Sequence, residues 1–241
     1  MFTVEKIRSE LKDKKPENLK TLYKEEYIKT MPKNKRKIYS DNIIECLIKN
    51  DIKTLFNEFE KYGKISRDND TYKKEHKVEE IYDIPNQWSK EKLTAKNLKH
   101  KKFKYIGEII DFETPIKNPG KENKEKNKGV GKVDLLAYFD DNNKKFLSLI
   151  EFKYKKNKES LLRAILEICT YYCQINREKL KTDFGYEKTI DVQKVVLVYK
   201  DSEQYNDYIN SKDNFMSLIK ELDVKICFFD GNEIVEIVEI E

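Results

Sequence analysis

Residues 131–154 read GKVDLLAYFDDNNKKFLSLIEFKY, two apolar runs on either side of the polar residues 140–145. Two short apolar runs joined by a polar turn predict a β-hairpin. If the turn pairs Phe139 with Phe146, the antiparallel register of the whole hairpin is fixed. A slip of one residue would turn every side chain to the other face, whereas a slip of two would change only the neighbours.

A charged cluster lies at one end of this predicted hairpin. In the register above, Leu136 opposes Leu149 and Asp134 opposes Glu151. Because side chains alternate between the two faces of a strand, Glu151 and Lys153 share the face of Leu149. Two carboxylates and one ammonium group therefore meet at the end of an apolar surface.

The charges of this cluster need a partner, because burying a charge is costly unless it is paired or binds a metal. Asp134 and Glu151 repel each other, and a divalent cation with oxygen ligands relieves that repulsion. Such an ion keeps coordination sites for water and a phosphate, and Lys153 would lie beside that water. The alternative interpretation is a structural salt bridge between Asp134 and Lys153 at the rim of the sheet.

Asp134, sixteen intervening residues and then Glu151-Phe152-Lys153 resemble the Asp…Glu-x-Lys signature of the PD-(D/E)XK nuclease superfamily. Val133 stands where the family has a proline. The resemblance covers roughly residues 103–200 and implies an α/β fold with a restriction-endonuclease-like core. That core consists of a helix, a three-strand antiparallel meander, a second helix and a parallel strand.

The resemblance also implies a mechanism and a substrate. Asp134, Glu151 and the carbonyl oxygen of Phe152 would hold Mg²⁺ or Mn²⁺, while Lys153 positions the attacking water. The expected activity is hydrolysis of phosphodiester bonds in nucleic acid, with DNA as the expected substrate and a homodimer as one assembly. The alternative is a noncatalytic protein of the same fold that binds nucleic acid or assembles with partners, because fold alone does not fix function.

A long helix is predicted upstream of the hairpin. Apolar residues recur with helical spacing from residue 38 to about residue 62, and a kink is expected near Asn50. In the family, a helix before the first core strand often gives an acidic residue to the metal site. On that resemblance Glu45 is the first candidate and Glu58 the second. The alternative is that Glu45 is a solvated helix carboxylate.

A second helix is predicted after the hairpin, over about residues 160–179, from its continuous apolar stripe. On one flank of it, Glu167 and Tyr171 lie four residues apart. They resemble a Gln-x-x-x-Tyr pair that leans toward the active site in many nucleases of the superfamily, with Glu in place of Gln. Arg163 and Glu167 would otherwise form an ordinary ion pair on the helix surface.

The remaining pattern completes an α/β arrangement. Core strands are predicted at residues 103–116 and 190–199. The second should lie parallel to the hairpin's last strand, because a helix crosses over between them. A helix near residues 214–222 follows, and then strands at 224–229 and 233–240 that form a hairpin or an added edge.

Composition limits the class of protein. The chain has 241 residues, 39% of them charged, and a net charge of +5. Only five of its 49 basic residues are arginine, so the lysine excess is weak evidence for a nucleic-acid partner. The four cysteines form no Cys-x-x-Cys pair, which argues against a disulfide framework and a zinc site. With no signal peptide or long apolar run in the sequence, we expect a cytoplasmic protein with no membrane partner.

We expect one main domain with two additions. Residues 1–36 are interpreted as an N-terminal helical appendage and residues 37–241 as the nuclease-like domain. An insertion at about residues 63–102 carries Trp88 and both histidines. The lysine-rich loop at residues 117–132 is expected to be mobile and to lie near the site.

Overall fold

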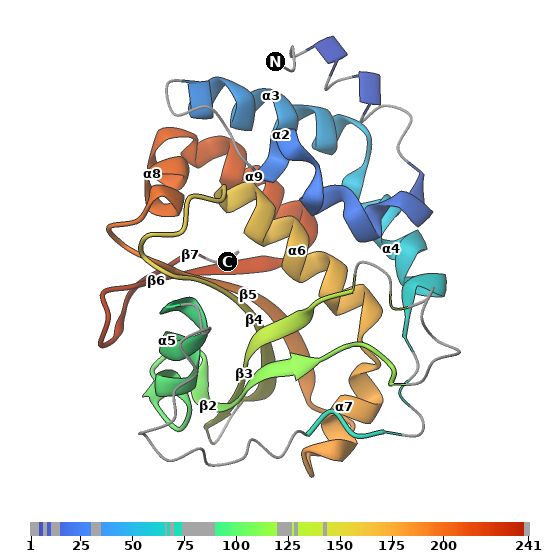
Figure 1. Cartoon of the computed structure of the whole chain (residues 1–241), viewed down its shortest axis with the longest axis vertical. Coiled ribbons are helices and arrows are strands. Elements are labelled where there is room, and N and C mark those ends of the chain that lie inside the picture. The colour runs from blue at the N-terminus through green and yellow to red at the C-terminus, as the bar shows by residue number, and fades with distance from the viewer. Residues whose placement is uncertain are drawn as a thin grey trace.

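The computed structural model shows an α/β protein with one twisted sheet and helices on both of its faces (Figure 1). It describes residues 5–6, 9–10, 15–29, 35–65, 67, 70–73, 90–119, 127, 130–141 and 144–238. Trp88, His76 and part of the lysine-rich loop lie outside these residues. Among the helices described, none is both long and apolar enough to cross a bilayer.

The strands lie in the sheet in the order in which they occur in the chain. They are β1 (Lys102–Phe103), β2 (Gly107–Pro115), β3 (Lys132–Asp141), β4 (Lys144–Lys153), β5 (Asp191–Tyr199), β6 (Val224–Phe229) and β7 (Ile234–Val238). Neighbours are antiparallel from β1 to β4 and again between β6 and β7. β4, β5 and β6 are parallel, as the predicted helical crossover requires.

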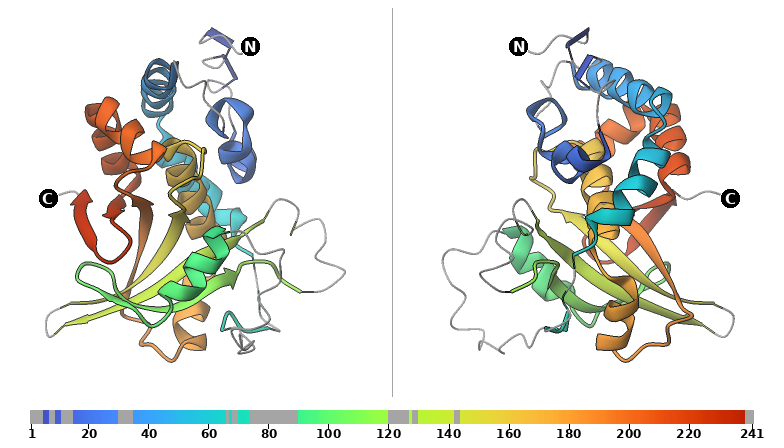
Figure 2. Two further views of the ribbon diagram at one scale, coloured as in Figure 1. Left: turned by 60° about the vertical axis from the view of Figure 1, so that its left-hand side comes forward. Right: turned by 90° about the vertical axis from the view of Figure 1, so that its right-hand side faces the viewer.

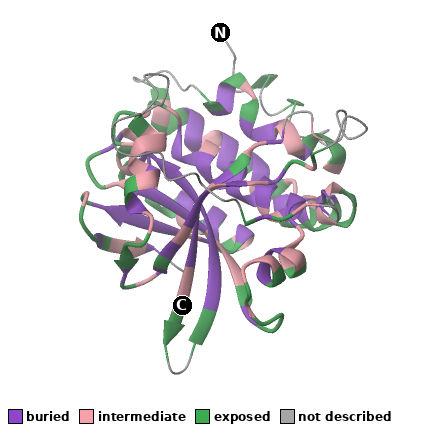
Figure 3. Cartoon of the chain, turned by 60° about the horizontal axis from the view of Figure 1, so that its bottom comes forward, coloured by how far each residue is buried: buried purple, intermediate pink, exposed green. Residues whose placement is uncertain are grey.

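Two helical layers of unequal size cover the sheet (Figure 2). Helix α5 (Lys90–Leu98) packs on one face. The other face carries η1 (Pro16–Lys24), α2 (Glu26–Lys29), α3 (Arg36–Lys49), α4 (Ile52–Gly63), α6 (Leu161–Gln174), α7 (Arg177–Asp183), α8 (Glu203–Asn210) and α9 (Lys212–Leu222). Almost every residue of α6 is buried, so this helix forms the centre of the larger layer (Figure 3).

The predicted hairpin and its register are confirmed. Phe139 pairs with Phe146, and their rings stack with centroids 4.7 Å apart. Leu136 pairs with Leu149, and both face the layer that contains α6. The face of β4 that carries Glu151 and Lys153 is therefore the face that α6 covers.

Two predicted elements are divided in the structure. The strand predicted at residues 103–116 becomes β1 and β2 because Gly107 has a φ of 82°, and a Cβ there would overlap the main chain of Tyr138. The helix predicted from residue 38 to 62 breaks near the expected kink. Asp51 adopts a left-handed conformation there and caps α4 by accepting a hydrogen bond from the N–H of Thr54.

The described part of the N-terminal segment belongs to the core and is not an appendage. Leu19 and Leu22 are fully buried, and Tyr23 is 1% exposed. η1 packs against α4 and α6, and its apolar residues join the cluster of the larger helical layer. Because these side chains complete the cover over α6, the expected boundary at residue 36 does not separate an independent unit.

Candidate active site

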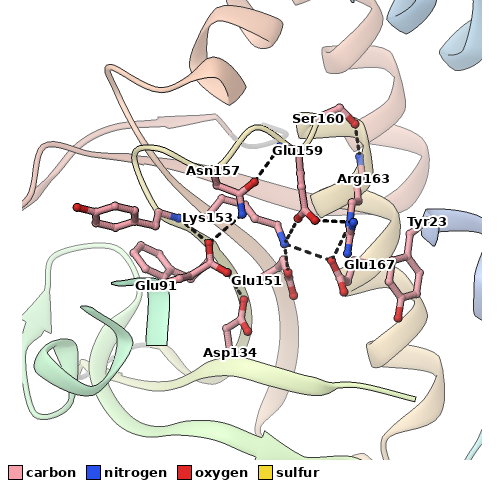
Figure 4. Close-up of polar contacts among 12 residues, drawn as sticks. Tyr23, Glu91, Asp134, Glu151, Lys153, Asn157, Glu159, Ser160, Arg163 and Glu167 are labelled. Carbon is pink, nitrogen blue, oxygen red and sulfur yellow. Dashed lines mark hydrogen bonds and ion pairs between the residues drawn. The ribbon is translucent and has the colours of Figure 1, made fainter. Parts of the chain in front are cut away.

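The predicted charged cluster forms where β3 and β4 stop pairing. The ladder runs as far as Leu135 and Ile150. One step further, the main-chain N–H of Phe152 donates to Oδ2 of Asp134 at 2.9 Å, where a strand-to-strand bond would otherwise lie. This hydrogen bond holds Asp134 across the end of β4, beside Glu151 (Figure 4).

Lys153 is enclosed by three carboxylates. Its Nζ lies 2.6 Å from Oε1 of Glu151, 3.0 Å from Oε2 of Glu159 and 3.3 Å from Oε2 of Glu167. Burial lowers the pKa of Lys153, but these carboxylates outweigh burial and raise the pKa well above its ordinary value. The ammonium group therefore stays protonated. The alternative salt bridge between Asp134 and Lys153 is not among the ion pairs of the described residues.

The charged forms of the two candidate metal ligands are disfavoured. Burial and, to a smaller extent, Glu91 raise the pKa of Asp134 to about 7, although Lys153 acts to lower it. Burial and then the charge of Asp134 raise the pKa of Glu151 well above its ordinary value. Oε2 of Glu151 is buried and has no hydrogen-bond partner within the described part of the chain. A divalent cation would supply that partner and remove the repulsion.

Mg²⁺ fits this donor set. No group of three or more His, Cys, Asp and Glu side chains is placed to hold a metal ion among the residues described. Mg²⁺, however, usually binds through one or two carboxylates and takes its other oxygen ligands from water and substrate phosphates. Asp134 and Glu151 meet that requirement. Phe152 gives its N–H to Asp134 and buries its side chain on the opposite face, so the role of its carbonyl oxygen stays a prediction.

The end of the β3–β4 hairpin forms one wall of the cluster, and helix α6 forms the second. Ser160 caps the helix by accepting a hydrogen bond from the N–H of Arg163 at 3.1 Å. The hydroxyl of Tyr171 donates to Oε1 of Glu167 at 2.7 Å, and Oε2 of Glu167 faces Lys153. Burial acts to raise the pKa of Glu167, but Lys153 and Arg163 outweigh it and lower the pKa. The structure thus brings both members of the predicted Glu-x-x-x-Tyr pair to the cluster.

The N-terminal segment supports this wall. The hydroxyl groups of Tyr23 and Tyr171 lie 3.4 Å apart, and their rings meet edge to face at 5.9 Å. Gly131, just before β3, allows Tyr171 its position, because a Cβ at residue 131 would overlap the Tyr171 hydroxyl. Tyr23 was not predicted as a site residue, since 148 positions separate it from Tyr171 and no local pattern connects them.

The structure does not bring Glu45 or Glu58 to the cluster. The side chain of Glu45 is 47% exposed and lies 4.0 Å from Lys49, and Glu58 is exposed on α4. The phase of α3 explains this placement. Its buried residues face α4, α8 and α9, which turns Glu45 to the solvent. Glu45 is therefore the solvated helix carboxylate of the alternative interpretation.

Glu91, which we did not predict, lies beside Asp134 instead. It belongs to the first turn of α5, and its Oε2 accepts hydrogen bonds from the N–H of Tyr154 at 2.9 Å and from Nδ2 of Asn157 at 3.0 Å. Glu91 therefore orders the loop that follows β4. Because α5 directly precedes β1, Glu91 takes the place in chain order that we expected for Glu45. No sequence motif marks it.

No family model matches the chain, and neither a curated protein nor a solved structure matches it.

The chemistry of the site follows from its charges. Two cations, Lys153 and Arg163, lie among five carboxylates, those of Glu91, Asp134, Glu151, Glu159 and Glu167. An excess of carboxyl groups over cations, beside a protonated lysine, suits a divalent cation and a phosphate ester.

Proposed function

We propose that the chain is a metal-dependent nuclease that hydrolyses phosphodiester bonds in nucleic acid, with DNA as the expected substrate. One observation carries the proposal: Asp134, Glu151 and Lys153 converge, and Oε2 of Glu151 is buried without a partner among the described residues. The order of elements supports it. A meander of β2, β3 and β4, then α6, then the parallel strand β5 is the order expected for a restriction-endonuclease-like core.

Asp134 and Glu151 would hold Mg²⁺ or Mn²⁺ between them. When bound, the ion would lower the pKa of a coordinated water and withdraw negative charge from the scissile phosphate. Neighbouring residues hold these two carboxylates in position. Phe152 fixes Asp134 through its N–H, and Lys153 fixes Glu151 through Oε1.

Lys153 acts as a positive charge and not as a general base. Neighbouring carboxylates hold its pKa well above the ordinary value, so it keeps its proton near neutral pH. A protonated ammonium group donates hydrogen bonds to the attacking water or to a phosphate oxygen as negative charge develops there. Glu167 and Tyr171 position this ammonium group, since Tyr171 holds the carboxylate that Lys153 contacts.

Asp134→Asn is the decisive variant for testing this activity. Removing Lys153 would leave several buried carboxylates unpaired, and such variants often lose much of their stability. Asn, in contrast, keeps the acceptor for the N–H of Phe152. Asp183→Asn is the matched control, because Asp183 also accepts a main-chain N–H, that of Tyr72 at 2.8 Å, but lies on α7.

The assay is incubation with supercoiled plasmid, linear duplex and single-stranded DNA, each with Mg²⁺, Mn²⁺ or EDTA. We expect metal-dependent cleavage by the wild type and Asp183→Asn, and a loss of about 100-fold or more in Asp134→Asn. Direct conversion of supercoiled to linear plasmid would indicate paired cuts by a homodimer. Equal cleavage by Asp134→Asn would refute the mechanism. Binding of DNA with no cleavage of any substrate would favour the noncatalytic alternative.

A further inference from the structure

The carboxylate of Glu159 lies between the two cations of the cluster. Its Oε2 is 3.0 Å from Nζ of Lys153, and its Oε1 is 2.5 Å from Nη1 of Arg163 (Figure 4). Glu159 belongs to the loop between β4 and α6, whereas the two cations belong to those elements themselves. An internal anion therefore occupies the space between an ammonium group and a guanidinium group, and it shares Lys153 with the candidate metal ligand Glu151.

The contact between Glu159 and Arg163 is close but poorly aligned. Nη1 of Arg163 is buried and, among the residues described, makes no hydrogen bond of normal geometry, even though the ion-pair distance is short. The side chain of Arg163 is 14% exposed, and Oε2 of Glu151 nearby is a second buried atom without a partner. Nη1 of Arg163 is thus a buried donor left incompletely satisfied, which is costly unless a ligand with acceptor atoms completes it, whereas Oε2 of Glu151 is an acceptor and suits the metal proposed above.

We propose that Lys153 and Arg163 form a subsite for a phosphate group of the substrate, and that the Glu159 carboxylate fills this subsite in the free chain. The proposal deepens the nuclease function above and rests on it for the identity of the substrate as a nucleic-acid phosphate. A phosphate matches the space because its oxygens accept charge-assisted hydrogen bonds from lysine and arginine. It carries more acceptor atoms than a carboxylate, so it can satisfy the donor that Glu159 leaves misaligned.

Glu159 can leave without a rearrangement of its loop. Its N–H donates to Oδ1 of Asn157 at 2.8 Å, and its carbonyl oxygen accepts from Nε2 of Gln204 at 2.7 Å. These bonds hold the main chain in place. The side chain is 23% exposed, so rotation about its own bonds carries the carboxylate to the solvent. The substrate would therefore compete with one side chain, and the resting enzyme would be partly self-inhibited.

Glu159→Gln tests this subsite, because the amide has the same shape and lacks the competing charge. Glu60→Gln is the matched control, since Glu60 pairs with Arg177 on another part of the same helical layer. Binding is measured in EDTA, by fluorescence anisotropy with a labelled 20-base-pair duplex and by calorimetry with inorganic phosphate. Initial cleavage rates with Mn²⁺ give KM and kcat separately.

We expect Glu159→Gln to bind the duplex and phosphate about three- to tenfold more tightly than the wild type, and to show a lower KM. Glu60→Gln should bind both ligands with the affinity of the wild type, and Arg163→Lys should retain part of the affinity that Arg163→Met loses.

Affinities of Glu159→Gln that are no tighter than those of Glu60→Gln would overturn the subsite, even if the wild type cleaves DNA. Tighter phosphate binding with no cleavage by any variant would support the subsite and refute the nuclease. Tighter binding of phosphate but not of the duplex would overturn the assignment to a nucleic-acid phosphate.

Discussion

Replacement of Asp134 by Asn should make the metal-free protein more stable, although the residue is a candidate metal ligand. The amide oxygen can accept the N–H of Phe152, which now donates to Oδ2 at 2.9 Å. What the substitution removes is a negative charge beside Glu151. In the absence of metal that charge on balance opposes the folded state, because burial and the neighbouring carboxylates disfavour it more than Lys153 and the N–H of Phe152 favour it.

The pKa of Asp134 sets the size of the effect. It rises from an ordinary 3.8 to about 7 in the folded state. Above pH 7, a shift of about three units corresponds to about 4 kcal/mol, and partial exposure of the side chain reduces this to about 2–4 kcal/mol. The folded state keeps the proton up to about pH 7, whereas the unfolded chain releases it near pH 4. The free energy of unfolding of the wild type should therefore fall as pH rises through this range, and that contribution should be absent from the variant.

Urea denaturation in EDTA at pH 4.5 and pH 8 measures this difference for the wild type, Asp134→Asn and the control Asp183→Asn. The free energy of unfolding of Asp134→Asn should exceed that of the wild type at pH 8 and approach it at pH 4.5. The free energy of unfolding of the control should not rise above that of the wild type. Mn²⁺ at 100 times its Kd should then stabilise the wild type by about 2.7 kcal/mol and leave Asp134→Asn unchanged. Equal stability in EDTA at pH 8, or equal stabilisation of both proteins by Mn²⁺, would refute the reasoning.

Two single variants and their combination test the Tyr171 side of the site, and a third single variant tests the N-terminal segment. Tyr171→Phe removes the hydroxyl that donates to Glu167, so we expect cleavage about tenfold slower and a stability loss of about 1 kcal/mol, from initial rates and urea denaturation. Gly131→Ala should displace the same hydroxyl and cost about 1–3 kcal/mol. The double variant should cleave no more slowly than the slower single variant, and fully additive rate losses would argue against a shared cause. Leu22→Ala removes a fully buried side chain and should cost about 2–5 kcal/mol in thermal or urea unfolding; a loss below about 1 kcal/mol would restore the N-terminal segment as an appendage.

The parts of the site that local sequence determines were predictable. The hairpin register followed from one turn, and that register fixed which face of β4 carries Glu151 and Lys153. Asp134 then had to reach the same end of the hairpin. Helical spacing placed Glu167 and Tyr171 on one flank of α6, and only a short loop separates that helix from β4.

The parts that depend on distant packing were not predictable from pattern. Glu91 reaches Tyr154 across 63 positions, and Arg36 reaches Asp207 across 171. No periodicity carries such information, because either side chain would look equally ordinary on a solvated helix. Glu45 lies away from the cluster for the same reason. Its position in the chain suggested a place in the metal site, but packing against α8 and α9 determined which side of α3 is buried.

The burial of the N-terminal segment against α6 has a consequence for biosynthesis. Tyr23 meets Tyr171 across 148 positions, which the ribosome takes about 7–30 s to add at roughly 5–20 residues per second. Throughout that interval the leucines of η1 have been synthesised, while the helix that covers them is not yet complete. η1 can pack on α4 early, but it gains its contacts with α6 only after that helix is made, and a nascent chain that ends before α6 has neither that cover nor a complete cluster of charges.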